Sequence, residues 1–142
     1  MSDTNDQVTP STYASVLRAG LFSDQVIWVT GGGSGIGRCV AHELASLGAT
    51  VVLSGRTQAK LDKVAGEIAD DGGRADTIAF DIRDEDAVKA GVKTIVERHG
   101  RTHGLVNNAG GQFPAPLMAI NKRGAGAGVF ACCALKYCSA TL

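Results

Sequence analysis

Five glycines within nine residues, in the stretch TGGGSGIGR (residues 30–38), constrain this chain more than any other feature of its 142 residues. The stretch follows VIWV (residues 26–29), an apolar run of strand length, and precedes a helical pattern of apolar residues from 36 to 47. Glycines between a strand and a helix permit a sharp turn, close approach of the main chain to a ligand, and tight helix packing. The flanks therefore favour a shaped loop over a flexible linker.

Strand-like and helical patterns alternate along the chain. Beyond the first strand and helix, we expect strands at 49–53, 75–80 and 104–106, and helices at 57–71 and from Asp84 to the stop at Gly100. Right-handed crossovers fold this order into a parallel sheet with helices on both faces. The predicted fold class is α/β, a doubly wound parallel sheet that is truncated after about four strands.

Each helical pattern predicts an apolar stripe that faces the sheet. Asp84 is expected to cap the third helix through its side chain, and Gly48 to end the first. The three stripes comprise Ile36, Val40, Leu44 and Leu47 in the first helix, Leu61, Val64 and Ile68 in the second, and Val88, Val92, Ile95 and Val96 in the third.

Composition excludes several classes of partner. Lys and Arg number 14 and so do Asp and Glu, so no net field attracts nucleic acid or an anionic membrane. No apolar run approaches the roughly 20 residues of a membrane span, and the polar lead at 1–20 does not resemble a targeting segment. Four cysteines without paired spacing predict idle thiols and no metal site. We expect a soluble cytoplasmic protein.

The glycine loop and the residues after the second strand predict a dinucleotide site. The free amides and the partial positive charge of a helix N-terminus suit a pyrophosphate, against the alternative of a plain tight turn. An acidic residue at the end of the second strand would favour NAD(H), but Arg56 stands there, nineteen residues after Gly37. A guanidinium matches a 2′-phosphate, so NADP(H) is predicted over NAD(H). The alternative is an arginine solvated at a helix start.

Three motifs in order resemble the short-chain dehydrogenase/reductase family over residues 20–124. They are TGxxxGxG from Thr30 to Gly37, Asp81-Ile82 after the third strand, and NNAG at residues 107–110. The resemblance implies a partial Rossmann-type dinucleotide-binding domain at 21–123. It also implies a role for each part of the site. The cofactor phosphates would be held by Gly31, Gly33, Ser34, Gly35, Ile36 and Gly37, and the 2′-phosphate by Arg56. Asp81 and Ile82 would flank the adenine, and Asn108, Ala109 and Gly110 would line the path to the nicotinamide ribose. Alternatively, Asp81 joins the cap of the next helix and Asn107 ties neighbouring strands.

The continuation NNAGGQFPAP resembles trans-2-enoyl-CoA reductases first and 2,4-dienoyl-CoA reductases next, through Gly111, Gln112 and Phe113. The resemblance implies an acyl-CoA substrate for the full-length family. That family's acid is a tyrosine followed four residues later by a lysine, but Leu17 follows Tyr13 and Thr141 follows Tyr137 at that spacing. No catalytic residue is therefore assigned, and the chain is expected to be inactive alone.

Residues 124–142 form an atypical tail with one charge, which departs from the family pattern. A shifted reading frame that truncates the enzyme, or a divergent natural tail, would explain it. The helices that form the family's subunit interface are missing, so the family homotetramer is doubtful. Three functions stay open, which are an oxidoreductase half that resembles enoyl-CoA reductases, a non-catalytic nucleotide-binding fragment, and a non-functional product.

Overall fold

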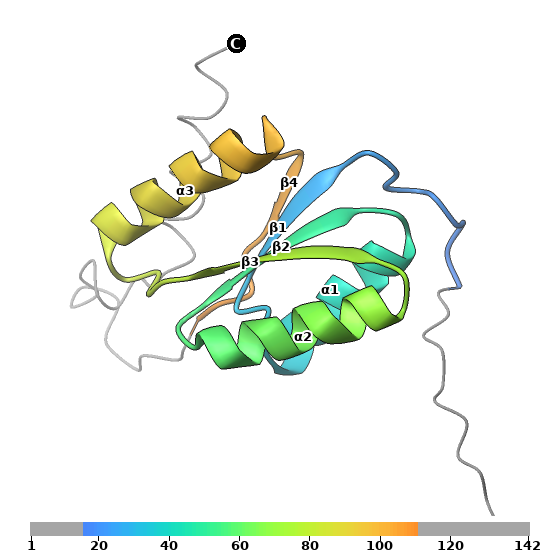
Figure 1. Cartoon of the computed structure of the whole chain (residues 1–142), viewed down its shortest axis with the longest axis horizontal. Helices are drawn as coiled ribbons and strands as arrows, with labels where there is room; N and C mark the ends of the chain where they lie inside the picture. Colours follow the sequence, from blue (N-terminus) through green and yellow to red (C-terminus); the bar gives the residue numbers. More distant parts are fainter. Residues whose placement is uncertain (1–15, 111–142) are drawn as a thin grey trace, which may run out of the picture.

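The computed structural model describes residues 16–110 of the chain (Figure 1). Most of the polar lead, the subfamily signature at 111–113 and the tail at 124–142 lie outside the described residues. The expected strands and helices are confirmed, with bounds shifted by at most two residues. The elements are β1 Val26–Thr30, α1 Gly35–Ser46, β2 Thr50–Gly55, α2 Gln58–Asp70, β3 Arg74–Ala79, α3 Glu85–His99 and β4 Gly104–Val106.

The described strands form one parallel sheet in the order β3-β2-β1-β4. In the register, Val26 lies beside Thr50, and Thr50 lies beside Arg74. The order runs outward from β1 to β2 and β3 on one side, and jumps to β4 on the other. Loops that leave the carboxyl ends of β1 and β4 therefore diverge at a topological switch point, which is where α/β sheets of this kind bind ligands.

Helices cover both faces of the sheet, as Figure 1 shows. On one face, α1 and α2 pack on a cluster that includes Val29, Val51 and Leu53. On the other face, α3 packs through Ile95 on a cluster that includes Trp28. The runs VIWV and VVL are buried at every position, because consecutive side chains of a strand alternate between two covered faces.

The Trp28 side chain anchors the α3 face of the sheet. Its ring meets Phe80 edge to face, with the ring centroids 6.0 Å apart. The indole N–H donates to the Ser54 hydroxyl at 2.8 Å, and both side chains are buried. The hydrogen bond satisfies two polar groups that would otherwise be costly to bury.

The stripe predicted for α1 is confirmed toward the C-terminal end of the helix, where Leu47 is buried and Leu44 packs partly buried on the core, but it is wrong at Ile36. The residues that α1 buries are Gly37, Ala41 and Ala45, while the Ile36 side chain is 75% exposed. A Cβ at Gly37 would collide with the Gly31 carbonyl oxygen and the Asn108 amide, so the helix begins in main-chain contact with the loop. Close approach selects small residues at spacing i, i+4, which a pattern of large apolar residues does not reveal.

The other two helices follow the sequence patterns. α2 buries Leu61, Val64 and Ile68 as expected. α3 buries Val88 and Ile95, and Val92 packs partly buried on the same face. The Asp84 side chain caps α3 by accepting from the amides of Asp86 and Ala87 at 3.1 Å each, as predicted.

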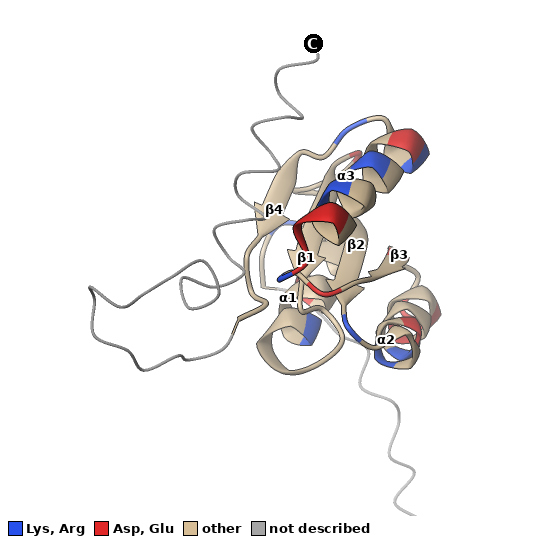
Figure 2. Cartoon of the chain, turned by 90° about the vertical axis from the view of Figure 1, so that its left-hand side faces the viewer, with Lys and Arg blue, Asp and Glu red and all other residues tan. Residues whose placement is uncertain are grey.

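Charged residues lie mainly on the helices and loops, and α3 carries residues of both signs along its length (Figure 2). Nothing in residues 16–110 forms a helix that is both long and apolar enough to cross a membrane.

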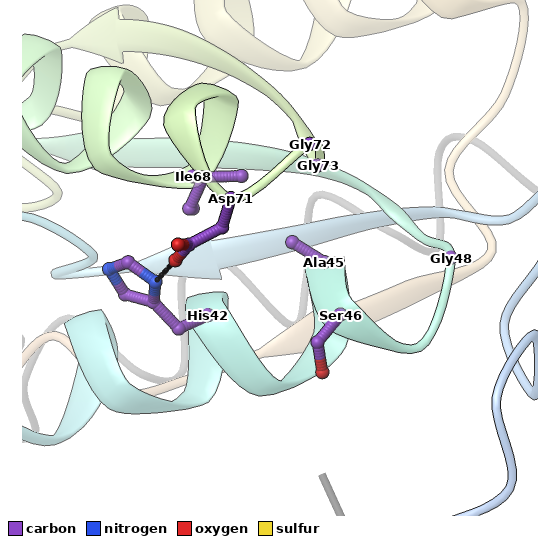
Figure 3. Close-up of a pocket in the computed structure, with 8 residues that line it drawn as sticks. All are labelled: His42, Ala45, Ser46, Gly48, Ile68, Asp71, Gly72 and Gly73. Carbon is purple, nitrogen blue, oxygen red and sulfur yellow. Dashed lines mark ion pairs between the residues drawn. The ribbon is translucent and has the colours of Figure 1, made fainter. Parts of the chain in front are cut away.

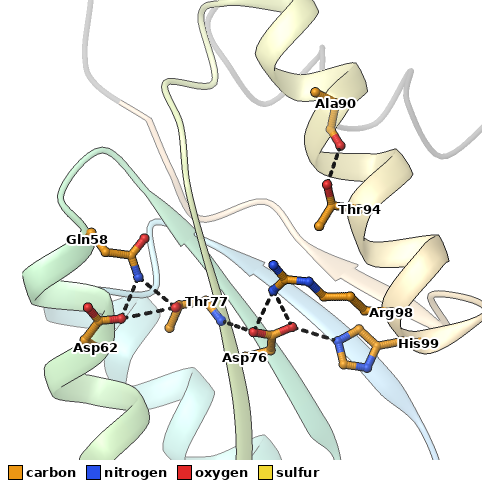
Figure 4. A network of polar contacts seen from close by, with 8 residues as sticks. All are labelled: Gln58, Asp62, Asp76, Thr77, Ala90, Thr94, Arg98 and His99. Carbon is orange, nitrogen blue, oxygen red and sulfur yellow. Dashed lines mark hydrogen bonds and ion pairs between the residues drawn. The ribbon is translucent and has the colours of Figure 1, made fainter.

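The edge strand β3 is attached to both neighbouring helices by polar side chains (Figure 4). Asp76 accepts from Arg98 at 2.9 and 3.0 Å and contacts His99 at 3.2 Å, both from α3. The next residue, Thr77, points to the opposite face and bonds Gln58 of α2 at 2.8 Å. Burial alone would raise the pKa of Asp76, but hydrogen bonds from Arg98, the Thr77 amide and His99 outweigh it and lower the pKa.

Candidate cofactor-binding site

The carboxyl ends of the strands bring together the residues predicted to bind the cofactor. The loop after β1 carries the glycines, β2 ends beside Arg56, β3 is followed by Asp81 and Ile82, and β4 is followed by Asn108, Ala109 and Gly110. Parallel strands end at the same edge of a sheet, so all four groups lie at one edge, on both sides of the switch point.

The glycine loop turns tightly before α1 begins. Gly31 has a φ of 69°, and its amide donates to the Ser54 carbonyl at 2.7 Å. Gly35, at the start of α1, has a φ of 55°. Side chains are strained at such positive values, so the turn requires glycine at both positions.

The amides at the head of α1 are available to a ligand. Ser34 is the N-cap residue in extended conformation, and within residues 16–110 its side chain makes no capping hydrogen bond. The first turn of the helix closes with Arg38 N–H donating to the Ser34 carbonyl at 3.2 Å. Amides that precede this bond have no partner within the helix, and the helix dipole adds positive charge there. The arrangement suits an anion such as a pyrophosphate.

Residues after β4 lock the glycine loop in place. The Asn108 carboxamide donates to the carbonyls of Thr30 and Gly31 at 3.1 and 3.2 Å. The Thr30 hydroxyl donates to the Val106 carbonyl at 3.2 Å and accepts from the amides of Asn108 and Ala109 at 3.1 and 3.0 Å. These bonds join the ends of β1 and β4 across the switch point.

The strand tie considered for Asn107 is therefore made by its neighbour. Asn107 is exposed, while Asn108 is half-buried against the loop. The sequence presents two adjacent asparagines with the same side chain, and the residue that faces β1 depends on where β4 ends. If β4 ended one residue earlier or later, the two asparagines would exchange roles. A difference of one residue is smaller than the error of strand bounds read from sequence patterns.

The part of the candidate site that the family resemblance assigns to adenosine, called the adenosine end below, is formed by the ends of β2 and β3. The Phe80 amide donates to the Gly55 carbonyl at 2.9 Å, so the next residues, Arg56 and Asp81, follow adjacent strand ends. Arg56 is exposed, as a residue that contacts a ligand must be. Ile82 follows Asp81 and is half-buried.

Asp81 is engaged by Arg83, which the sequence analysis missed. The Arg83 Nη2 lies 2.6 Å from Oδ2, its Nε lies 3.0 and 3.1 Å from the two carboxylate oxygens, and its main-chain amide donates to Oδ1 at 3.0 Å. Hydrogen bonds from the Arg83 side chain and then its amide lower the pKa of Asp81 from 3.8 to about 2, and the charge of Arg56 contributes to the lowering.

The role proposed for Asp81 in the helix cap belongs to Asp84. The Asp81 carbonyl accepts from the Asp84 amide at 3.0 Å, and the side chain of Asp84 makes the cap. An aspartate whose side chain bonds the amide two residues later is a common turn, so the DIRD sequence at 81–84 held a signal for the Asp81–Arg83 contact.

A separate pocket of about 230 Å³ lies at the opposite edge of the sheet, between the C-terminal ends of α1 and α2 (Figure 3). His42 Nδ1 and Asp71 Oδ2 approach to 3.5 Å at this pocket, and His42 Nε2 lies 3.3 Å from Glu67. These groups join two helices to one another. None of the predicted cofactor residues lines the pocket.

Comparisons with known proteins agree with this geometry. The short chain dehydrogenase family matches residues 25–127. The chain is 34% identical over 110 residues to the peroxisomal 2,4-dienoyl-CoA reductase [(3E)-enoyl-CoA-producing] of Danio rerio, covering 77% of this chain and 37% of that protein. This chain therefore spans little more than a third of that relative's length.

Solved structures share the fold. The citronellol catabolism dehydrogenase (AtuB) of Pseudomonas aeruginosa PAO1 is 50% identical with a TM-score of 0.76, covering 88% of this chain and 54% of that protein. A metagenomic short-chain oxidoreductase in complex with NADP is 41% identical with a TM-score of 0.65, covering 78% and 50%. The match over 25–127, together with the glycine loop joined to the NNAG segment at the switch point, establishes that this chain belongs to the short-chain dehydrogenase family.

Proposed function

We propose that this chain binds NADP(H) and forms the cofactor-binding half of an oxidoreductase. The observation that carries the proposal is the head of α1, whose amides lack partners within the helix and lie beside the switch point between β1 and β4. A bound nicotinamide cofactor supplies a hydride or accepts one. This chain's residues supply the binding and the orientation.

The glycine loop fits the phosphates of the cofactor. A side chain on Gly31 or Gly37 would meet Asn108 instead of open space, so these two glycines serve the fold of the loop. At Gly35 a Cβ would find no described atom within 4 Å, yet φ still requires glycine. No side chain of these glycines therefore covers the outer side of the loop. A pyrophosphate could approach the amides of Gly35, Ile36 and Gly37 there, and Gly33 and Ser34 lie next to them.

Arg56 supports NADP(H) rather than NAD(H). It stands exposed at the end of β2, where an acidic residue would instead bind the ribose hydroxyls of NAD(H). A guanidinium pairs with a 2′-phosphate through parallel hydrogen bonds. The similarity at 41% identity to a short-chain oxidoreductase solved with NADP supports the same choice.

The remaining residues extend the site along the sheet edge. Asp81 and Ile82 would flank the adenine from the end of β3, and Ala109 and Gly110 would border the nicotinamide ribose. In this proposal Asn108 acts from behind the loop, because its carboxamide is already bonded to Thr30 and Gly31.

For the substrate we propose an enoyl-CoA thioester, reduced at the double bond next to the thioester carbonyl in the whole enzyme. The similarity to a 2,4-dienoyl-CoA reductase supports this class. The similarity to a citronellol catabolism dehydrogenase makes a compound of citronellol catabolism the competing candidate, with citronellol itself as the first to test. No tyrosine in these 142 residues has a lysine four residues after it, so we propose that they bind cofactor without turnover.

A titration and an assay on the purified chain test the proposal. Fluorescence titrations with NADPH and NADH should show binding of both, with NADPH bound more tightly. NADPH oxidation should stay at background with crotonyl-CoA, and NADP⁺ reduction should stay at background with citronellol. Binding of neither nucleotide would refute the cofactor site, equal affinities would refute the role of Arg56, and turnover would refute the binding-only proposal.

A further inference from the structure

Arg83 occupies an unexpected position at the adenosine end of the site. The guanidinium and the main-chain amide of this one residue contact both oxygens of the Asp81 carboxylate, through four contacts between 2.6 and 3.1 Å. The Asp81 side chain is 31% exposed and the Arg83 side chain is 67% exposed. The pair therefore lies at the protein surface, rather than in the core, and it follows the strand end beside Arg56.

The contact changes the charge that a ligand meets at this edge. Arg56 and Asp81 follow paired strand ends, and the positive charge of Arg56 helps to lower the pKa of Asp81. An ionised Asp81 without Arg83 would cancel much of the attraction of Arg56 for an anion. With Arg83 bound to Asp81, the two charges offset each other and the positive charge of Arg56 is left in excess. Such charges act on one another over about 8 Å at physiological salt.

We propose that Arg83 is a positioning residue that sets the preference for the 2′-phosphorylated cofactor, by holding Asp81 in place and neutralising its charge. The inference rests on the proposed function, because it concerns the same NADP(H) site. The 2′-phosphate is the chemical difference between NADP(H) and NAD(H), so the charge at this edge acts on the ratio of the two affinities.

A purely structural role for Arg83 predicts a different outcome. If Arg83 only fixed the turn at 81–84, its loss would displace the adenine-binding residues and weaken both cofactors equally. The ratio of the NADH to the NADPH dissociation constant separates these alternatives, because a general loss of folding or shape cancels from it.

The experiment measures this ratio by fluorescence titration of the full chain with NADPH and NADH. Arg83→Gln should lower the ratio about tenfold, a typical effect of one unpaired charge near a bound anion, with a smaller effect at high salt. Arg83→Lys should restore most of the ratio. In the double variant Asp81→Asn with Arg83→Gln, the ratio should return to within about twofold of the starting value, since both charges are removed together.

Arg98→Gln is a matched control. It breaks another arginine–aspartate pair, with Asp76 on β3, away from the predicted cofactor residues, and should leave the ratio unchanged. An unchanged ratio in Arg83→Gln, equal weakening of both cofactors, or no recovery in the double variant would overturn the inference while leaving the proposed function intact. An unsubstituted chain that binds neither nucleotide would overturn the proposed function and this inference together.

Discussion

The two ends of the candidate site are built on different principles. The glycine loop at 31–37 is held by main-chain geometry and by half-buried hydrogen bonds from Asn108 and Thr30. The adenosine end is held by exposed charges on Arg56, Asp81 and Arg83. The first end should be intolerant of added side-chain atoms, and its hold on the loop should depend little on salt because these bonds are not ion pairs. The second should tolerate substitution and respond to salt and pH. In the function proposed above, shape would fix the cofactor class and charge would select its variant.

The largest expected effect is that of Gly37→Ala. A Cβ there would collide with the Gly31 carbonyl and with Asn108, and both neighbours are fixed by other bonds. We expect the free energy of unfolding to fall by about 3 kcal/mol, at the upper end for overpacking, and cofactor affinity to fall below detection. Urea denaturation and NADPH titration measure the two losses.

Gly66→Ala is the control for this substitution. Gly66 lies exposed within α2, and no described atom comes within 4 Å of a Cβ built on it. Alanine should raise the free energy of unfolding by about 0.5–1 kcal/mol there, since glycine disfavours helix. Equal stability of the two variants would show that the loop is not tightly packed against the residues after β4. The statement that shape holds the glycine loop would then be wrong.

A smaller loss is expected from Thr30→Val, which keeps the shape of the side chain and removes its hydroxyl. Two amides, of Asn108 and Ala109, would lose their acceptor. We expect the free energy of unfolding to fall by about 1–3 kcal/mol, the usual cost of buried donors without partners. Asn107→Ala, at an exposed neighbour, should stay within about 0.5 kcal/mol of the unsubstituted chain in the same urea titration.

The order of strands and helices could be predicted because it depends on periodicity and on stop signals such as Gly100. Both are visible in the sequence itself. The glycine loop could be predicted for the same reason, since only glycine suits a φ of 69° at Gly31. These features are local to the chain. The strand and helix order and the glycine loop could be predicted because local sequence preferences agree with the final fold at these places.

Two of the features that escaped prediction depend on how separate elements meet, and a third is a local choice of partner. The small residues on the buried face of α1 were missed because the helix approaches the loop so closely that Gly37, Ala41 and Ala45 face inward and Ile36 is left exposed. The choice of Asn108 over Asn107 depends on the register at the end of β4. The Asp81–Arg83 contact is local, and the DIRD sequence signals the bond from the Arg83 amide. It does not signal the bonds from the Arg83 side chain, because several charged residues stand nearby and sequence order does not say which of them pair.

Arg56→Gln tests the charged end directly. Loss of the guanidinium should weaken NADPH binding about tenfold, because a charge-assisted hydrogen bond is worth about 1.5–3 kcal/mol before solvent competes at an exposed site. NADH binding should change less than twofold. Titrations at low and high salt should show the NADPH difference shrinking with salt. If the difference were the same at both, the adenosine end would be selecting by shape, as the glycine loop does.

The smallest expected effect is the pH response of Asp81. Arg83 holds the pKa of Asp81 at about 2, below its ordinary value of 3.8, so the folded state binds this proton less readily than the unfolded state. The resulting stabilisation is present in full above pH 3.8 and is lost as pH falls through 2. Asp81→Asn should therefore be less stable than the unsubstituted chain above this window, and the deficit should disappear below it.

Gly37→Ala sharpens the same measurement, because glycine and alanine carry no titratable side chain. Its deficit in the free energy of unfolding should be equal at both ends of the window, while that of Asp81→Asn closes. Protonation of Asp76 and Glu67, whose pKa values are also lowered, destabilises every variant alike and cancels from these differences. A Gly37→Ala deficit that closed in acid would mean that the charged end supports the loop, and the two ends would then act as one cooperative unit.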